Sequence, residues 1–175
     1  ADPRDLHSFP TRRSSDLLRE RFRQQAGELA VLDHENIIKI LDFDETREPY
    51  LYSTTEYIDE SEFLSSILSK EKKIPLDKAL EIAIGIADGL AHAHSKKIIH
   101  QSVTPENIII CENRAILSGF GIASILHEPD SFSGLLGKVE YFSPEQIAKK
   151  KVDHRSDIFS LGVILYQMLS GKMPF

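Results

Sequence analysis

The chain has 175 residues, 41% of them hydrophobic and 27% charged, and a formal net charge of −6. This composition is typical of a folded globular protein and excludes disordered, collagen-like and coiled-coil chains. The apolar runs are far shorter than the roughly 18 residues of a membrane-spanning helix, so no span is expected. The acidic balance argues against a nucleic-acid-binding surface. The single cysteine, Cys111, has no metal-ligand spacing around it and favours a reducing, cytoplasmic environment.

Residues 1–17 show neither helical nor strand periodicity and contain two prolines and four serines or threonines. From Arg4 to Leu17 the sequence resembles the translation of a common short-read sequencing adapter. The alternative is a natural basic, serine-rich tail. We expect residues 1–17 to be a non-native leader that takes no part in the fold.

Periodicity predicts the elements of the first third of the chain. Apolar residues recur every three or four positions over residues 18–32, which indicates an amphipathic helix. Two stretches rich in β-branched and aromatic residues, 37–43 and 50–57, indicate neighbouring antiparallel strands around the charged turn 44–49. Residues 59–67 then read as a polar opening into a short helix.

The remaining elements alternate between helix and hairpin. The strongest helical periodicity runs over residues 76–94. Two β-type runs, 107–111 and 114–117, predict a small hairpin. The polar segment 119–144 is too long for an ordinary connection and is therefore expected to be functional. Residues 157–169 again predict a mostly apolar helix.

Four motifs then occur in a fixed order. They are HQSVTPENII at 100–109, SGFGIA at 118–123, FSPEQ at 142–146 and DIFSLGVILYQMLSGKMPF at 157–175. Their order and spacing resemble those of the eukaryotic-like Ser/Thr protein kinase family, especially its bacterial branch. The interval from Ser102 to Asn107 equals the family's interval between the catalytic-loop Asp and its Asn. The resemblance implies an α+β, two-lobed protein kinase-like fold.

The resemblance also implies how the chain is divided. Residues 18–58 would be part of the small β-rich lobe, with its helix C, its strands 4 and 5 and the interlobe hinge. Residues 59–175 would be part of the large helical lobe and would stop after its helix F. The fold is therefore expected to be incomplete at both ends, with the family's glycine-rich loop and strand-borne lysine preceding Leu18.

Phosphoryl transfer needs charged groups that most of the matching positions lack. Ser102 stands where the family has its catalytic Asp, and a serine hydroxyl is a poor proton acceptor that carries no charge to orient a substrate. The other replacements are Gly119 for the metal-binding Asp, Thr104 for a lysine near the transferred phosphate, Gln25 for the Glu of the charged pair and Gln101 for the Arg before the catalytic Asp. We therefore expect no competent catalytic set.

Structural positions match the family where catalytic positions do not. The matching residues are Leu29, His100, Pro105, Glu106, Asn107, Phe120, Pro144, Glu145 and Asp157. In the activation segment, Ser143, Pro144 and Glu145 match the closing motif, whereas Lys138 replaces a threonine. Loss of charged chemistry within a kept scaffold resembles a pseudokinase. Asn107 alone is a neutral amide, which does not hold Mg²⁺ without carboxylates, so no metal site is expected.

The hinge-like segment Thr55-Glu56-Tyr57-Ile58 points to a nucleotide. The resemblance implies that backbone groups of Glu56 and Ile58 bind adenine, that Thr55 guards the inner pocket, and that Ile109 forms an apolar floor near Asn107. ATP is thus the cofactor that the resemblance implies, without bound Mg²⁺. The alternative is that these residues are a strand end and a core aliphatic with no nucleotide between them.

The preferred function is a catalytically impaired kinase-like domain with a regulatory or scaffolding role in signalling, which contacts a protein partner and no nucleic acid. One alternative is an active kinase that transfers the ATP γ-phosphate to protein hydroxyls, with Glu106 or Glu140 as a substitute base. Another is a non-functional gene fragment. His92, His94 and His100 are expected to have packing roles, because His92 and His94 lie on different helix faces.

Overall fold

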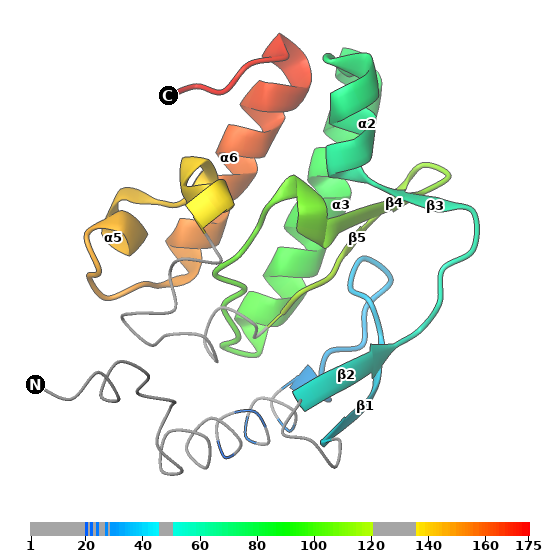
Figure 1. The fold of residues 1–175 in the computed structure, drawn as a ribbon, viewed down its shortest axis with the longest axis vertical. Helices are drawn as coiled ribbons and strands as arrows, with labels where there is room; N and C mark the ends of the chain where they lie inside the picture. Colours follow the sequence, from blue (N-terminus) through cyan, green and yellow to red (C-terminus); the bar gives the residue numbers. More distant parts are fainter. Residues whose placement is uncertain are drawn as a thin grey trace, which may run out of the picture.

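The structure is a computed structural model that describes residues 20, 22, 24, 27, 29–45, 51–120 and 136–175. Residues 20, 22, 24, 27 and 29 are helical, in agreement with the periodicity of the first predicted helix. The predicted leader, most of the polar segment 119–144 and Gln25 lie outside the described residues. The described part forms a two-stranded sheet and a larger unit in which three strands pack with helices (Figure 1).

The small sheet pairs β1 (Ile40–Glu45) with β2 (Leu51–Thr55) in antiparallel fashion, which confirms the predicted strand pair. The prediction began β1 three residues too early. Ile37 instead forms a parallel bridge to Leu117, and the Ile38 amide donates to the Leu117 carbonyl at 2.8 Å. These residues therefore connect the small sheet to the larger unit.

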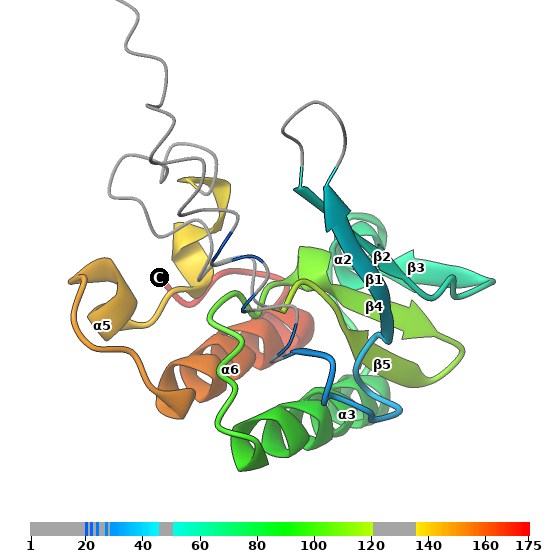
Figure 2. The ribbon, with the colours of Figure 1, turned by 90° about the horizontal axis from the view of Figure 1, so that it is seen from below.

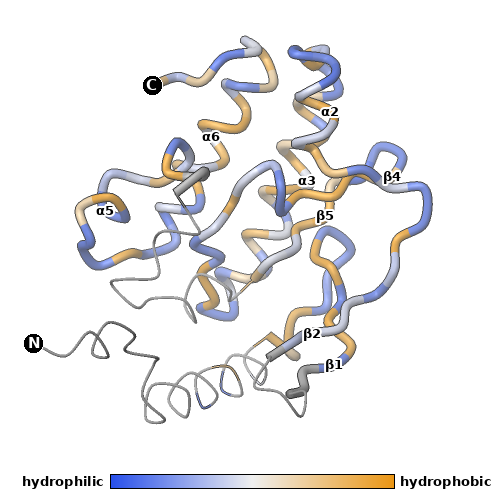
Figure 3. Tube along the Cα trace, in the orientation of Figure 1, coloured by the Kyte–Doolittle hydropathy of each residue, from blue (hydrophilic) through white to orange (hydrophobic). Residues whose placement is uncertain are grey.

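The larger sheet has the order β3-β4-β5, all antiparallel, with β3 (Ser61–Phe63), β4 (Ile108–Cys111) and β5 (Arg114–Leu117). The predicted hairpin is confirmed, and Figure 3 shows its apolar strands joined by a hydrophilic turn. Residues 59–67 were predicted as a polar opening into a short helix, and the strand β3 within them was missed. Three residues are too few to show strand periodicity, and β3 forms only because β4 supplies its hydrogen-bond partners.

The predicted helices are present with small shifts. They are α2 (Leu64–Glu71), α3 (Leu76–Ser95) and α6 (His154–Ser170). The structure adds three short helices that were not predicted, α5 (Pro144–Ile147) and the 3-10 helices η1 (Pro105–Asn107) and η3 (Leu136–Tyr141). Helix α6 begins three residues before its predicted start because the Asp153 carboxylate caps it, accepting from the Arg155 amide at 2.9 Å. The bonded Arg155 side chain lowers the pKa of Asp153 to about 2.

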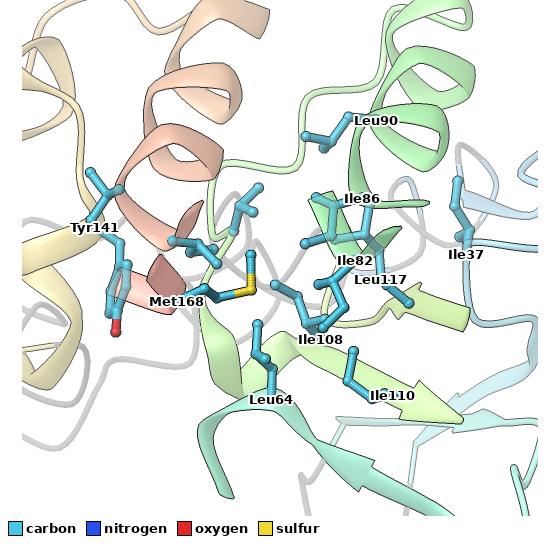
Figure 4. Close-up of a cluster of buried hydrophobic side chains, with 14 of the residues drawn as sticks. Ile37, Leu64, Ile82, Ile86, Leu90, Ile108, Ile110, Leu117, Tyr141 and Met168 are labelled. Carbon is cyan, nitrogen blue, oxygen red and sulfur yellow. The ribbon is translucent and has the colours of Figure 1, made fainter. Parts of the chain in front are cut away.

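The main core lies between α3, α6 and the three-stranded sheet. Helix α3 packs against both β5 and α6, as the view from below shows (Figure 2). Ile82, Ile108 and Met168 are fully buried and meet in this layer (Figure 4). Among the described residues, no helix combines the length and apolarity needed to cross a membrane.

The loop before the small sheet lies between α3 and β5 and contacts both. The Asn36 side chain donates to the Ala115 carbonyl at 2.7 Å, and the Asn36 carbonyl accepts from the Leu117 amide at 2.8 Å. A Cβ at Gly89 of α3 would lie 2.9 Å from the Asn36 carbonyl oxygen and 3.0 Å from Leu117 Cδ1. The absence of a side chain at Gly89 therefore lets the loop approach the helix closely.

We expect Gly89→Ala to lower the free energy of unfolding by about 1–2 kcal/mol, because overpacking against a backbone carbonyl outweighs the helix-propensity gain of up to about 1 kcal/mol. Gly162→Ala in α6 is the matched control, since a Cβ there has nothing within 4 Å. It should raise stability by about 0.5–1 kcal/mol. Urea unfolding of both variants measures this, and equal effects at the two sites would contradict the packing argument.

Candidate functional site

The catalytic-loop backbone is fastened to α6 by the carboxylate of Asp157, which is 1% exposed. Its Oδ2 accepts from the His100 amide at 2.9 Å and lies 2.7 Å from His94 Nε2, while its Oδ1 accepts from the Gln101 amide at 2.8 Å. A buried carboxylate is stable only with such partners. The path of the loop at residues 100–101 is therefore set by a side chain from another element.

His100 joins the catalytic loop to the segment that carries Gly119. Its Nδ1 accepts from the Ser102 amide at 3.3 Å, so in the neutral ring Nε2 carries the proton and donates to the Ser118 carbonyl at 2.9 Å. Burial lowers the pKa of His100, although the Asp157 charge acts in the opposite direction. The His100 ring also packs against Phe120, with 4.2 Å between ring centroids. His100 thus links the catalytic loop to residues 118–120.

Asn107 contacts Ser102 on one side and the space beside Gly119 on the other. Asn107 Nδ2 donates to the Ser102 carbonyl at 2.8 Å and lies 3.2 Å from its Oγ. Gly119 has φ +77°, and a Cβ there would lie 2.8 Å from both Cγ and Oδ1 of Asn107. The Asn107 amide therefore occupies the space into which a side chain at position 119 would project.

Asn107 and Gly119 line a cavity of about 290 Å³, near the lower end of the range for ligand pockets. Thr55 lines the same cavity, and its role as a guard of a nucleotide pocket stays a prediction. Most of the lining is apolar, contributed by residues such as Leu29 and Phe120. Among the described lining residues, Glu106 is the one charged side chain.

The other predicted adenine contacts lie outside this cavity. Glu56 and Ile58 line a second cavity of about 410 Å³, together with Lys39 and Arg114. The Glu56 amide donates to the Lys39 carbonyl at 2.9 Å, and the Glu56 carboxylate accepts from the Lys39 amide at 2.9 Å. Ile109 lines neither cavity and packs with Ile58 in a small hydrophobic cluster. The adenine contacts of Glu56, Ile58 and Ile109 stay a prediction.

Thr104, at the position of the family's lysine, is fully buried, and its Oγ1 has no hydrogen-bond partner among the described residues. A buried hydroxyl without a partner costs free energy. Thr104 does not line either of these cavities. Thr104 is therefore not placed to contact a molecule bound in either cavity.

Hydrogen bonds hold the closing motif of the activation segment in place. Ser143 caps α5, and Pro144 occupies its first turn. The Glu145 carboxylate accepts from the Ser156 hydroxyl, and this bond lowers the pKa of Glu145. Lys138 falls in η3, and its side chain lies outside the described ones. The prediction missed Gln146, although the capping-box pattern of Ser143 and Gln146 signals it.

The three histidines do not form one group. The His92 ring packs against His34 with 5.0 Å between centroids, whereas His94 and His100 both contact Asp157. The role of His94 was predicted as packing alone, but it also supports the buried carboxylate. Among the described residues, no three His, Cys, Asp or Glu side chains come together as metal ligands would.

We expect Gly119→Ala to cost about 1–3 kcal/mol of stability, because it combines a left-handed backbone with a contact to Asn107. Asn107→Ala removes that contact, so the double variant should be less destabilised than the sum by about 1 kcal/mol. Denaturant unfolding of the four proteins measures the coupling. Gly171→Ala, with φ +73° at the end of α6, is the control and should be additive with Asn107→Ala.

Comparisons with known proteins agree with this geometry. The protein kinase domain family matches residues 8–175. The chain is 39% identical over 166 residues to the serine/threonine-protein kinase pkn2 of Myxococcus xanthus. This match covers 89% of this chain and 20% of the length of that protein. It is 35% identical over 162 residues to PknB of Mycobacterium leprae and 35% identical over 158 residues to PrkC of Bacillus subtilis, both described as serine/threonine-protein kinases.

These two matches each cover 89% of this chain, and they cover 26% and 24% of the respective relative. The chain thus spans about a quarter or less of the length of these curated relatives. The family match extends over nearly the whole sequence and includes the catalytic loop, the Phe120-Gly121 motif and the closing motif of the activation segment. The chain therefore belongs to the protein kinase family, with the α+β kinase-like fold that its motifs predict.

Proposed function

We propose that this chain is a catalytically impaired protein kinase-like domain, a pseudokinase, with a regulatory or scaffolding role in signalling through contact with a protein partner. The observation that carries the proposal is the meeting of Ser102, Asn107 and Gly119. Two of these positions lack the carboxylate that phosphoryl transfer requires, and the Asn107 amide fills the adjoining space. Losing such charged contacts lowers a rate by several orders of magnitude.

The apolar lining of the cavity supports binding of a nucleotide base, and the missing carboxylates argue against a bound Mg²⁺. Mg²⁺ is usually held by carboxylates together with substrate phosphates. Ser102 and Gly119 have no carboxylate to offer a metal ion. The described lining of the cavity contains the anionic Glu106 and no cationic side chain. An adenine ring, by contrast, fits a mostly apolar wall. We therefore include ATP among the ligands of the site, with the base in the cavity beside Thr55 and no bound metal.

An active kinase is the second candidate, and one observation favours it. Glu106 lines the same cavity as Asn107 and Gly119, so a carboxylate lies next to the replaced positions. Glu140 is exposed in η3 and lies in the segment that faces a substrate in the family. Either carboxylate would have to act as the base in place of Ser102.

The two candidates differ in phosphate transfer. Incubating the full chain with ATP labelled at the γ-phosphate, with Mg²⁺ or with EDTA, should give no Mg²⁺-dependent incorporation into itself or into a protein substrate. Ser102→Ala should behave like the wild type, because the hydroxyl has no catalytic role. Incorporation that survives Ser102→Ala but disappears in Glu106→Gln or Glu140→Gln would establish the active kinase instead.

Binding is tested by thermal unfolding. ATP should raise the melting temperature of the full chain by the same amount in Mg²⁺ and in EDTA, because ligand bound to the native state stabilises it by mass action. Thr55→Phe is the control variant, since a ring at the cavity wall should abolish the shift. A shift seen only with Mg²⁺ would contradict metal-independent binding.

A further inference from the structure

Gln146 connects two parts of the site that lie far apart in the sequence. From α5, its Nε2 donates to the Gln101 carbonyl of the catalytic loop at 2.8 Å. Gln101 has φ +62°, a left-handed conformation that is uncommon outside glycine. The carbonyl that Gln146 meets is therefore presented by a constrained backbone, which Asp157 holds through the Gln101 amide.

The same side chain also completes the cap of α5. Gln146 Oε1 accepts from the Ser143 amide at 3.0 Å and lies 3.2 Å from the Ser143 hydroxyl. Ser143 Oγ in turn accepts from the Gln146 amide at 3.4 Å, and Ser143 is 1% exposed. Both ends of the Gln146 amide are thus engaged, one by the cap and the other by the catalytic loop.

Two contacts from α6 close these bonds into a circuit, and Figure 1 shows α5 beside the amino-terminal half of α6. The Ser156 hydroxyl donates to the Glu145 carboxylate, next to Gln146. Asp157, which follows Ser156 in α6, accepts a hydrogen bond from the Gln101 amide at 2.8 Å. We call this set the anchor circuit; its residues are Gln101, Ser143, Glu145, Gln146, Ser156 and Asp157.

The link between catalytic loop and activation segment in this circuit is uncharged. An Arg side chain at position 101 could pair with a phosphate on the activation segment, and the Gln101 side chain has no charge for such a pair. The link to Gln146 uses the backbone carbonyl of Gln101, which accepts from a neutral amide and needs no phosphate. We propose that Gln146 is a positioning residue that holds residues 141–147 on the catalytic loop whether or not the activation segment is phosphorylated. This inference rests on the proposed scaffolding function and adds that the surface offered to a partner is constitutively formed.

Hydrogen exchange of the full chain tests the proposal. Gln146→Glu keeps an acceptor for the Ser143 cap but loses the donor to Gln101, so it isolates the link from the cap. Amides of residues 100–104 should exchange about tenfold faster in this variant, the size expected for one lost hydrogen bond. Gln146→Met, which loses both functions at the same length, should also speed exchange over residues 141–147.

Gln167→Glu is the matched control, because Gln167 Oε1 accepts from Tyr141 Oη at 2.8 Å and a carboxylate can do the same. It should leave exchange over residues 100–104 unchanged, as should phosphatase treatment of the wild type. Wild-type exchange in Gln146→Glu, or a phosphatase effect on residues 141–147, would overturn the proposal. Phosphate incorporation in the transfer assay would instead contradict the pseudokinase function and leave the exchange result standing.

Discussion

The site depends on the burial of one carboxylate. Removing Asp157 from water costs several kcal/mol for an isolated ion, and the backbone amides of His100 and Gln101 together with His94 offset that cost. Because two of these donors belong to the catalytic loop, α6 determines the path of the loop. The loop is therefore held by contacts that do not involve a charged residue at position 102.

Within this frame the replaced positions are adapted to one another. The Asn107 amide bonds to Ser102 and lies where a side chain at position 119 would project, and Gly119 takes a left-handed backbone that suits glycine. Thr104 is buried away from both cavities. Neither position 102 nor position 119 carries a carboxylate, and the Asn107 amide occupies the space that a side chain at position 119 would take.

Elements with strong local periodicity were predicted well, and elements that depend on a distant partner were not. Helix α3 and the β4–β5 hairpin follow from residues close in sequence. Strand β3 exists because β4 pairs with it, and the early part of the first predicted strand pairs with Leu117 instead. At the site, the sequence named Ser102, Asn107 and Gly119 but did not predict that Asn107 contacts Ser102 and fills the space beside Gly119. It did not predict that Glu56 and Ile58 line a different cavity from Thr55.

The sequence by itself determined the family and the absence of charged side chains at positions 102 and 119, because residue identity and spacing in the motifs are properties of the chain alone. Only the tertiary structure decided which groups satisfy one another: Asp157 with the catalytic loop, Asn107 with the space beside Gly119, and Gln146 with Gln101. The physical reason is that a hydrogen bond is specified by distance and direction between two groups. Residues separated by 45 or 56 positions acquire that geometry only when the helices and strands between them have packed.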